Sequence, residues 1–265
     1  MISSLFSVLT IKPAWLTRGR SLMLAIAVGS VIGSTTQGTS QTLPLAENLT
    51  AYDTPQGEQL LIESTARDDF WELSAQFLTQ STQSYCGVAS AVMVLNSLKL
   101  PAPIDPRYQP YGVFTQENFF QNPKTEQVLP AKIVQRQGMT LGQLGELLES
   151  HGAVVKVIPA STTTLEDFRR LTRENLAQSD NYVLINYLRK EMGQKIGGHI
   201  SPLAAYHQGS DRFLILDVAR YKYPPVWVKT EDLWRSLNTV DQVSGQSRGF
   251  VLVGKHAPSA QADGK

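Results

Sequence analysis

The chain has 265 residues, of which 42% are hydrophobic and 18% charged, a composition typical of a folded protein with a sizeable core. A net charge of +1 gives no electrostatic reason to expect nucleic acid or an anionic membrane as a partner. The single cysteine, Cys86, excludes an internal disulfide and a thiolate-rich metal site.

The first 41 residues have the pattern of a targeting segment. Three basic residues precede the apolar stretch 21–33, and small or polar residues follow it. This order is typical of a bacterial signal peptide, so we expect a signal peptide or N-terminal leader at 1–41 and export to the periplasm. An uncleaved membrane anchor is the alternative, although the apolar stretch is short for a membrane-spanning helix.

The length allows one large domain or two small ones, and the small, polar residues 257–265 predict a flexible tail. The predicted helices cover residues 57–64, 87–98, 140–150, 165–176 and 231–237. The predicted strands cover 153–158, 182–187, 199–207, 212–218, 226–228 and 249–253. The segment 108–130 has no clear pattern, and a loop of that size is either functional or partly helical. Because helices come first and an antiparallel sheet later, the predicted fold class is α+β.

The rest of the chain is organised around the helix at 87–98, which is apolar on every side and must be covered. Cys86 lies where a polar loop enters the N-terminus of this helix. The helix dipole and the free N–H groups there favour the thiolate, which is the nucleophilic form of cysteine. A structural role is the alternative, since a free cysteine usually packs as a small hydrophobic residue.

Gln80 favours the catalytic interpretation because it lies six positions before the cysteine. In papain-like enzymes a glutamine at that spacing and the backbone N–H of the cysteine both donate hydrogen bonds to the oxyanion. Such a site also needs a histidine and an asparagine or aspartate further along the chain.

His199 and Asp217 are the predicted partners of the thiol. His199 follows two glycines at the start of a strand, and Asp217 lies at the end of the next strand. If the hairpin closes around the turn at 208–211, the two residues lie about opposite each other, which brings an imidazole beside a carboxylate. The other histidines lie at a helix end, at the mouth of the hairpin and in the tail: His151, His207 and His256.

Each partner has an alternative interpretation when it is considered by itself. His199 could be a core histidine bonded to the backbone, and Asp217 could cap a turn. A carboxylate after four apolar residues needs a partner, however, because a buried charge is costly unless it is paired. Together with Gln80 and Cys86, the pair favours a triad in which Cys86 attacks, His199 protonates the leaving group and Asp217 orients the ring.

Longer motifs of this chain resemble the phytochelatin synthase family, a branch of the papain-like cysteine peptidase fold. The resemblance covers about residues 60–253 and rests on the motifs at 86–98, 186–189, 198–206, 216–227 and 248–250. It implies a papain-like fold, with the cysteine on a central buried helix packed against an antiparallel sheet. It also implies that residues 42–256 form a single catalytic domain.

The family cleaves glutathione between its cysteine and its glycine. The resemblance implies that the γ-glutamylcysteinyl group forms a thioester with Cys86 and then passes to water or to the amine of a second glutathione. The second route would make phytochelatin. Plant-type members carry a further, cysteine-rich domain that this sequence lacks, so we expect mainly hydrolysis, as in the short bacterial members.

By their places in the motifs, Asn186, Arg189 and Arg248 resemble substrate-contacting residues of the family, and Asp241 is a candidate for binding the substrate ammonium. Arginine suits a substrate with two carboxylates because its planar guanidinium binds a carboxylate through two hydrogen bonds. Surface salt bridges are the alternative role for these arginines.

Glutathione is therefore the expected small-molecule partner, and a homodimer is left open. No cofactor is expected for hydrolysis, and no metal site is predicted in the protein. We expect cadmium or zinc ions to act through the thiolate of glutathione.

Two other functions, an ordinary peptidase and a binding protein, fit the residues less well than glutathione cleavage. A papain-like peptidase acting on ordinary peptides would have no need for Asn186, Arg189 and Arg248, because an endopeptidase does not neutralise substrate termini. A binding protein on a degenerate peptidase scaffold would have no use for an intact Cys86 and His199 together with Gln80 and Asp217.

Overall fold

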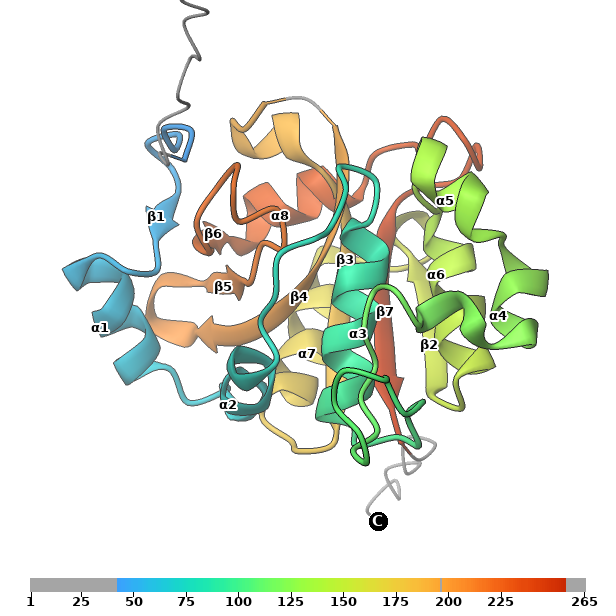
Figure 1. Ribbon diagram of the computed structural model, residues 1–265. Helices are drawn as coiled ribbons and strands as arrows, with labels where there is room; N and C mark the ends of the chain where they lie inside the picture. The colour runs from blue at the N-terminus through green and yellow to red at the C-terminus, as the bar shows by residue number, and fades with distance from the viewer. Residues whose placement is uncertain (1–41, 196, 256–265) are drawn as a thin grey trace, which may run out of the picture. The chain divides into compact units, whose positions relative to one another are not determined.

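The computed structural model describes residues 42–195 and 197–255, which contain a seven-stranded antiparallel sheet (Figure 1). The strand order is β1-β6-β5-β4-β3-β7-β2. The strands are β1 (Thr50–Ala51), β2 (Val154–Pro159), β3 (Asn181–Leu188), β4 (Gly198–His207), β5 (Arg212–Ile215), β6 (Val226–Lys229) and β7 (Gly249–Gly254). The predicted leader at 1–41 and tail at 257–265 lie outside the described residues.

The described part of the chain also has eight α-helices: α1 (Pro55–Glu63), α2 (Asp68–Ala75), α3 (Cys86–Ser97), α4 (Pro123–Val128), α5 (Ala131–Gln137), α6 (Leu141–Ser150), α7 (Leu165–Leu176) and α8 (Thr230–Leu237). Within that part, no helix has the length and apolar character needed to cross a bilayer. The predicted α+β class is confirmed, as are the five predicted helices and six predicted strands, although β5 is shorter than expected. The elements β1, α2, α4 and α5 were not predicted.

The sheet is covered on both faces, which explains the apolar run in β3 (Figure 1). Tyr182 and Leu184 pack in one hydrophobic cluster with α3, whereas Val183 and Ile185 pack in a second cluster with α7 and α8. Successive side chains of a strand point to opposite faces, so neighbouring residues enter different clusters. The helix that begins at Cys86 is therefore held against the centre of the sheet.

Small side chains allow α3 to pack closely on β4. Ala89, Ser90 and Ala91 are fully buried, and the Ser90 hydroxyl donates a 3.1 Å hydrogen bond to the carbonyl of Ile200. This bond satisfies a polar group inside an apolar interface, where an unpaired hydroxyl would be costly. It also ties the helix to the strand that carries His199.

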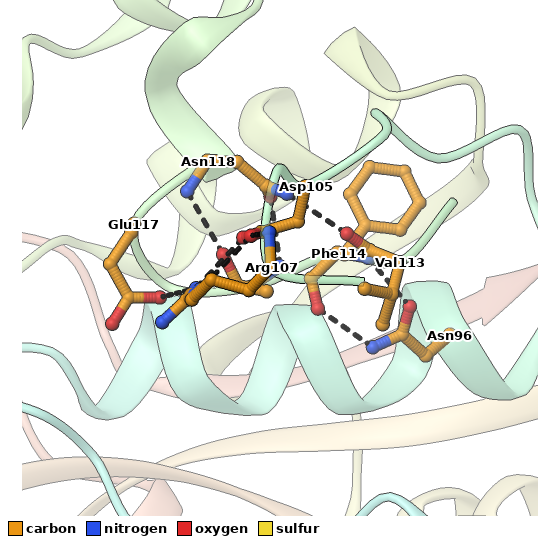
Figure 2. A network of polar contacts seen from close by, with 8 residues as sticks. Asn96, Asp105, Arg107, Val113, Phe114, Glu117 and Asn118 are labelled. Atoms are coloured by element: carbon orange, nitrogen blue, oxygen red, sulfur yellow. Dashed lines mark hydrogen bonds and ion pairs between the residues drawn. The ribbon is translucent and has the colours of Figure 1, made fainter. Parts of the chain in front are cut away.

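The segment after α3 folds back over the C-terminal half of that helix (Figure 2). The Asn96 side chain donates to the carbonyl of Phe114 and accepts from its N–H, at 3.0 and 2.9 Å. Asp105 is buried and pairs with Arg107 through two hydrogen bonds of 2.9 and 2.8 Å. These contacts order a stretch in which the sequence showed no periodic pattern.

Asp69, in the first turn of α2, is a buried carboxyl group with no hydrogen-bond partner among the described residues. It is 2% exposed, and burial, with a smaller contribution from Asp68, raises its pKa well above the usual value. The folded protein thus holds this proton to a higher pH than the unfolded chain does. The stability contributed by the proton is complete below about pH 4 and is lost as the pH rises through the folded-state pKa.

We therefore expect Asp69→Asn to raise the free energy of unfolding by about 1–3 kcal/mol at pH 8 and to change it little at about pH 4. Thermal or denaturant unfolding at both pH values measures the difference. Asp68→Asn, at the exposed neighbouring position, is the control and should change the free energy by less than about 0.5 kcal/mol at either pH. A variant at Asp69 that is no more stable than the wild type at pH 8 would contradict this account.

Candidate active site

Cys86 is the first residue of α3 and its thiol is partly exposed in a cavity. Tyr85 precedes it as the N-cap and makes no side-chain capping bond, so free N–H groups remain at the helix start. A Cβ atom on Gly87 would lie 2.5 Å from Sδ of Met139, so the Met139 side chain would have to shift for any larger residue after the cysteine. The predicted place of the thiol, where a loop enters the helix, agrees with the structure.

The structure brings together the imidazole and the carboxylate that were predicted as partners. Nε2 of His199 lies 2.8 Å from Oδ1 of Asp217, and both side chains are buried. The same oxygen accepts a 2.8 Å hydrogen bond from the N–H of Ala219. Because Nε2 is engaged, Nδ1 is the ring nitrogen left to face Cys86.

The route by which the two residues meet differs from the expected cross-strand pairing. His199 is paired with Tyr187 of β3, and β5 ends at Ile215, before Asp217. Leu216 still donates to the carbonyl of Pro202, but a proline has no N–H with which to continue the ladder. The chain leaves the sheet there, and the carboxylate reaches His199 from a turn beyond the strand.

Burial and charge act in opposite directions on the pKa values of these groups. Burial raises the pKa of the Cys86 thiol, but the charge and hydrogen bond of His199 lower it more, so the pKa lies below its usual value. Burial lowers the pKa of His199, and the charge of Asp217 more than offsets this effect and raises it. The net directions favour a thiolate beside an imidazolium, which is the reactive form of such a pair.

Arg189 lies elsewhere than expected. Its guanidinium is buried beside the His199–Asp217 pair, where it donates a 2.9 Å hydrogen bond to Oδ1 of Asp217, and it does not line the cavity. The prediction of a substrate contact used the motif position alone. Sequence spacing does not show that a carboxylate 28 positions later takes up the guanidinium.

Gln80 is buried near the loop that leads to the thiol. Its Nε2 donates to the carbonyl of Thr82 at 2.6 Å and to the hydroxyl of Tyr221 at 3.2 Å. The hydroxyl of Tyr221 is thus a direct contact of Gln80, and burial raises the pKa of this phenol. Sequence reasoning missed Tyr221, although it lies within the resembling motif at 216–227.

The cavity beside the thiol has a volume of about 460 Å³ and is lined by polar residues. Three of the predicted substrate contacts, Asn186, Asp241 and Arg248, line it together with Cys86 and His199. Asn186 comes from strand β3, whereas the other two belong to the segment between α8 and β7. One cavity thus contains the thiol and groups able to bind a charged ligand.

The Nη atoms of Arg248 contact its neighbours, whereas its Nε has no hydrogen-bond partner among the described residues. Its Nη1 donates to the carbonyl of Val240 at 2.7 Å, and Nη2 lies 3.7 Å from the Asp241 carboxylate. Its Nε is buried without a hydrogen-bond partner among the described residues. A Cβ atom on Gly198 would lie 3.1 Å from Nη2, so glycine before the histidine leaves room for the guanidinium.

The opposite wall of the cavity comes from α5, α6 and their connection, and sequence reasoning missed it. Arg136 and Met139 line the cavity from this side. Pro130 directly before α5 and Gly138 directly after it are start and stop signals that could have identified the helix.

Two of the other histidines lie in unrelated surroundings. His151 ends α6 as predicted, and burial lowers its pKa to about 4, so it is neutral at physiological pH. His207 contacts Ser210 at 2.8 Å and Glu63 at 3.3 Å. His256 lies outside the described residues. Among residues 42–195 and 197–255, no group of three His, Cys, Asp or Glu side chains could hold a metal ion.

Fold and site together define an α+β protein with a cysteine-centred candidate active site in a polar cavity. The sequence model of the family described as phytochelatin synthase matches residues 40–250, and the chain belongs to this family.

Relatives carry names that fit this assignment. Glutathione gamma-glutamylcysteinyltransferase 3 of Lotus japonicus is 33% identical over 213 residues, which cover 78% of this chain and 43% of the relative. Glutathione gamma-glutamylcysteinyltransferase 1 of the same plant is 35% identical over 207 residues, which cover 77% and 40%. The glutathione gamma-glutamylcysteinyltransferase of Schizosaccharomyces pombe is 26% identical over 212 residues, which cover 79% and 50%. The match therefore spans half or less of the length of each of these relatives.

Proposed function

We propose that this protein cleaves glutathione to glycine and a γ-glutamylcysteinyl thioester on Cys86. The acyl group then passes mainly to water, and otherwise to a second glutathione. The observation that carries the proposal is the single polar cavity that contains the thiol, His199 and the Arg248–Asp241 pair. The names of the relatives supply the substrate class. A papain-like architecture is part of the proposal, supported by a helix that starts at the cysteine and packs on an antiparallel sheet.

In the acylation step, the thiolate of Cys86 attacks the carbonyl carbon of the cysteinyl residue. The oxyanion that forms accepts hydrogen bonds from the N–H of Cys86 and from Nε2 of Gln80, which must exchange its longer bond to Tyr221 for this one. His199 gives its proton to the amine of glycine as the C–N bond breaks. Asp217 keeps the ring oriented and stabilises its positive charge.

In the deacylation step, the neutral ring of His199 takes a proton from water. The resulting hydroxide attacks the thioester, γ-glutamylcysteine leaves, and the thiolate of Cys86 is restored. The amine of a second glutathione attacks in the same way when transfer replaces hydrolysis.

The γ-glutamyl end of the substrate carries an ammonium and a carboxylate. We assign the carboxylate to Arg248 and the ammonium to Asp241, with Asn186 bonding an amide of the acyl part. The free Nε of Arg248 and its long contact with Asp241 leave both groups able to take these partners.

We expect Arg248→Lys to raise KM for glutathione about 10- to 100-fold with a smaller change in kcat, because lysine keeps the charge and loses the planar fork. The group acts far from the bond that breaks, so its loss weakens binding of the substrate and the transition state alike. Initial rates of glycine release against glutathione concentration measure both constants. Arg235→Lys, in an exposed pair with Asp232, is the matched control and should leave both constants unchanged. An unchanged KM in Arg248→Lys would mean that the carboxylate binds elsewhere.

The experiment that tests the proposed substrate compares three tripeptides: glutathione, N-acetylglutathione and the α-linked Glu-Cys-Gly. We expect rapid glycine release from the first only, because the other two lack a free ammonium or place the carboxylate differently. Mass spectrometry of the products distinguishes the two reactions: hydrolysis gives γ-glutamylcysteine, and transfer gives longer γ-glutamylcysteinyl peptides. Equal cleavage of all three would favour the alternative, a papain-like peptidase acting on ordinary peptides.

Cadmium or zinc would enter this reaction as a thiolate complex of the substrate, and hydrolysis would need no cofactor. Because the pattern of residues 1–41 is typical of a signal peptide, the proposal includes export of the enzyme to the periplasm.

A further inference from the structure

Arg189 is 2% exposed and its guanidinium contacts both oxygens of a single carboxylate. Nη2 donates to Oδ1 of Asp217 at 2.9 Å, and Nη1 forms an ion-pair contact of 2.7 Å with Oδ2. Nη1 also donates to Oε1 of Gln194 at 2.6 Å. The guanidinium is thus engaged entirely inside the protein, through hydrogen bonds to Asp217 and Gln194 and the ion-pair contact with Oδ2.

Aromatic rings fix the guanidinium from its faces. Its central carbon lies 5.8 Å from the ring centre of Tyr187 and 5.2 Å from that of Tyr223. Tyr187 also packs edge to face on the ring of His199, with 5.6 Å between ring centres. Arg189, Asp217, Tyr187 and His199 therefore form one packed group of direct contacts.

The charges of this group explain why a cation is needed. A thiolate and a carboxylate beside one imidazolium leave a net negative charge in a buried place, where an unbalanced charge is costly. The guanidinium brings the sum to zero. The charge of Cys86 also acts on the phenols of Tyr187 and Tyr221, whose pKa values are both raised, so these two groups add no charge.

We propose that Arg189 is a positioning residue of the active centre, which aims Oδ1 of Asp217 at His199 and balances the charge of the thiolate and the carboxylate. The inference rests on the catalytic roles proposed above. It replaces the substrate contact expected for this residue from the sequence.

The test uses the full chain and the variants Arg189→Gln and Arg189→Lys. The first readout is the rate of Cys86 alkylation by iodoacetamide as a function of pH, which reports the thiolate and needs no glutathione. In Arg189→Gln we expect the rise of this rate to move to higher pH by about one unit or more, because the thiolate loses a nearby cation and a well-oriented imidazolium. We also expect kcat for glycine release to fall about 100-fold with little change in KM.

Arg189→Lys keeps the charge but cannot contact both carboxylate oxygens. We expect it to retain the wild-type alkylation profile while kcat falls about tenfold. This variant keeps the proposal testable if Arg189→Gln does not fold, since a wild-type kcat in Arg189→Lys would overturn the positioning role.

Arg169→Gln is the matched control, because Arg169 also pairs with an aspartate, through two hydrogen bonds of 3.0 Å to Asp211. Arg169 is far from the thiol in sequence and does not line the cavity. This control variant should leave the alkylation profile and kcat unchanged. An unchanged alkylation profile in folded Arg189→Gln would mean that Arg189 has only a structural role. If KM for glutathione also rose in that variant, Arg189 would instead contact the substrate. If the alkylation profile of Arg189→Gln shifts as expected but the wild type does not cleave glutathione, the role of Arg189 is supported and the proposed substrate is refuted.

Discussion

Cys86→Ser should form no acyl adduct with glutathione and release no glycine, with activity reduced roughly 10⁴-fold or more. Cys86 is the only cysteine of the chain, so no other thiol can take its place. A serine hydroxyl in this position is almost fully protonated, and neither the helix start nor His199 lowers its pKa enough to make an alkoxide. The wild type, mixed briefly with glutathione, should gain the mass of one γ-glutamylcysteinyl group.

Intact-protein mass spectrometry with an amino-acid assay for glycine measures both results in one sample. The substitution exchanges sulfur for oxygen at a partly exposed position, so thermal unfolding of the variant should stay close to that of the wild type. Ser74→Ala, at an exposed position outside the cavity lining, is the control and should keep the adduct. Glycine release by Cys86→Ser at the wild-type rate would refute the nucleophile.

His199→Gln should lower kcat about 10²- to 10⁴-fold, since the leaving amine then receives no proton from the ring. The carboxylate of Asp217 keeps its partner Arg189, so the site should still fold. His207→Gln makes the same substitution at a buried histidine that contacts Ser210 and Glu63, and it should leave kcat unchanged. Equal losses in both variants would indicate a general effect on folding.

The Cys86 thiol and the His199 imidazole together predict how the rate of the wild type depends on pH. The rate should rise as Cys86 loses its proton, at a pH below the ordinary thiol value of about 8.5, because the thiol pKa is lowered. It should fall as His199 loses the proton that the amine needs, at a pH above the ordinary histidine value of about 6.5, because that pKa is raised. His199→Gln should move the rising limb upward, and a profile without two limbs would contradict the ion pair.

Much of the site could be predicted because its signals are local. A polar loop, a cysteine and a run of small and apolar residues define the start of α3 whatever surrounds it. The strands β3 and β4 were recognised from their apolar, β-branched residues. Asp217 was identified because a carboxylate after an apolar run needs a partner.

The elements that escaped prediction are short. The helices α4 and α5 have six and seven residues, too few for a hydrophobic period to be recognised, and such helices are stable only through tertiary packing. α4 lies near the end of the segment 108–130, in which the sequence has no clear pattern, and α5 follows that segment directly. The cavity wall with Arg136 and Met139 was missed with them.

The fold class, the place of Cys86 at a helix start and the pairing of His199 with Asp217 could all be predicted from the sequence, and the family motifs added the cavity residues Asn186, Asp241 and Arg248. The contacts of Arg189 and the path by which Asp217 reaches the histidine became visible only in the folded chain. Both depend on contacts between side chains distant in sequence. An arginine beside a strand can bind a substrate or a buried carboxylate with the same chemistry, and only the packed positions of its neighbours select one of them.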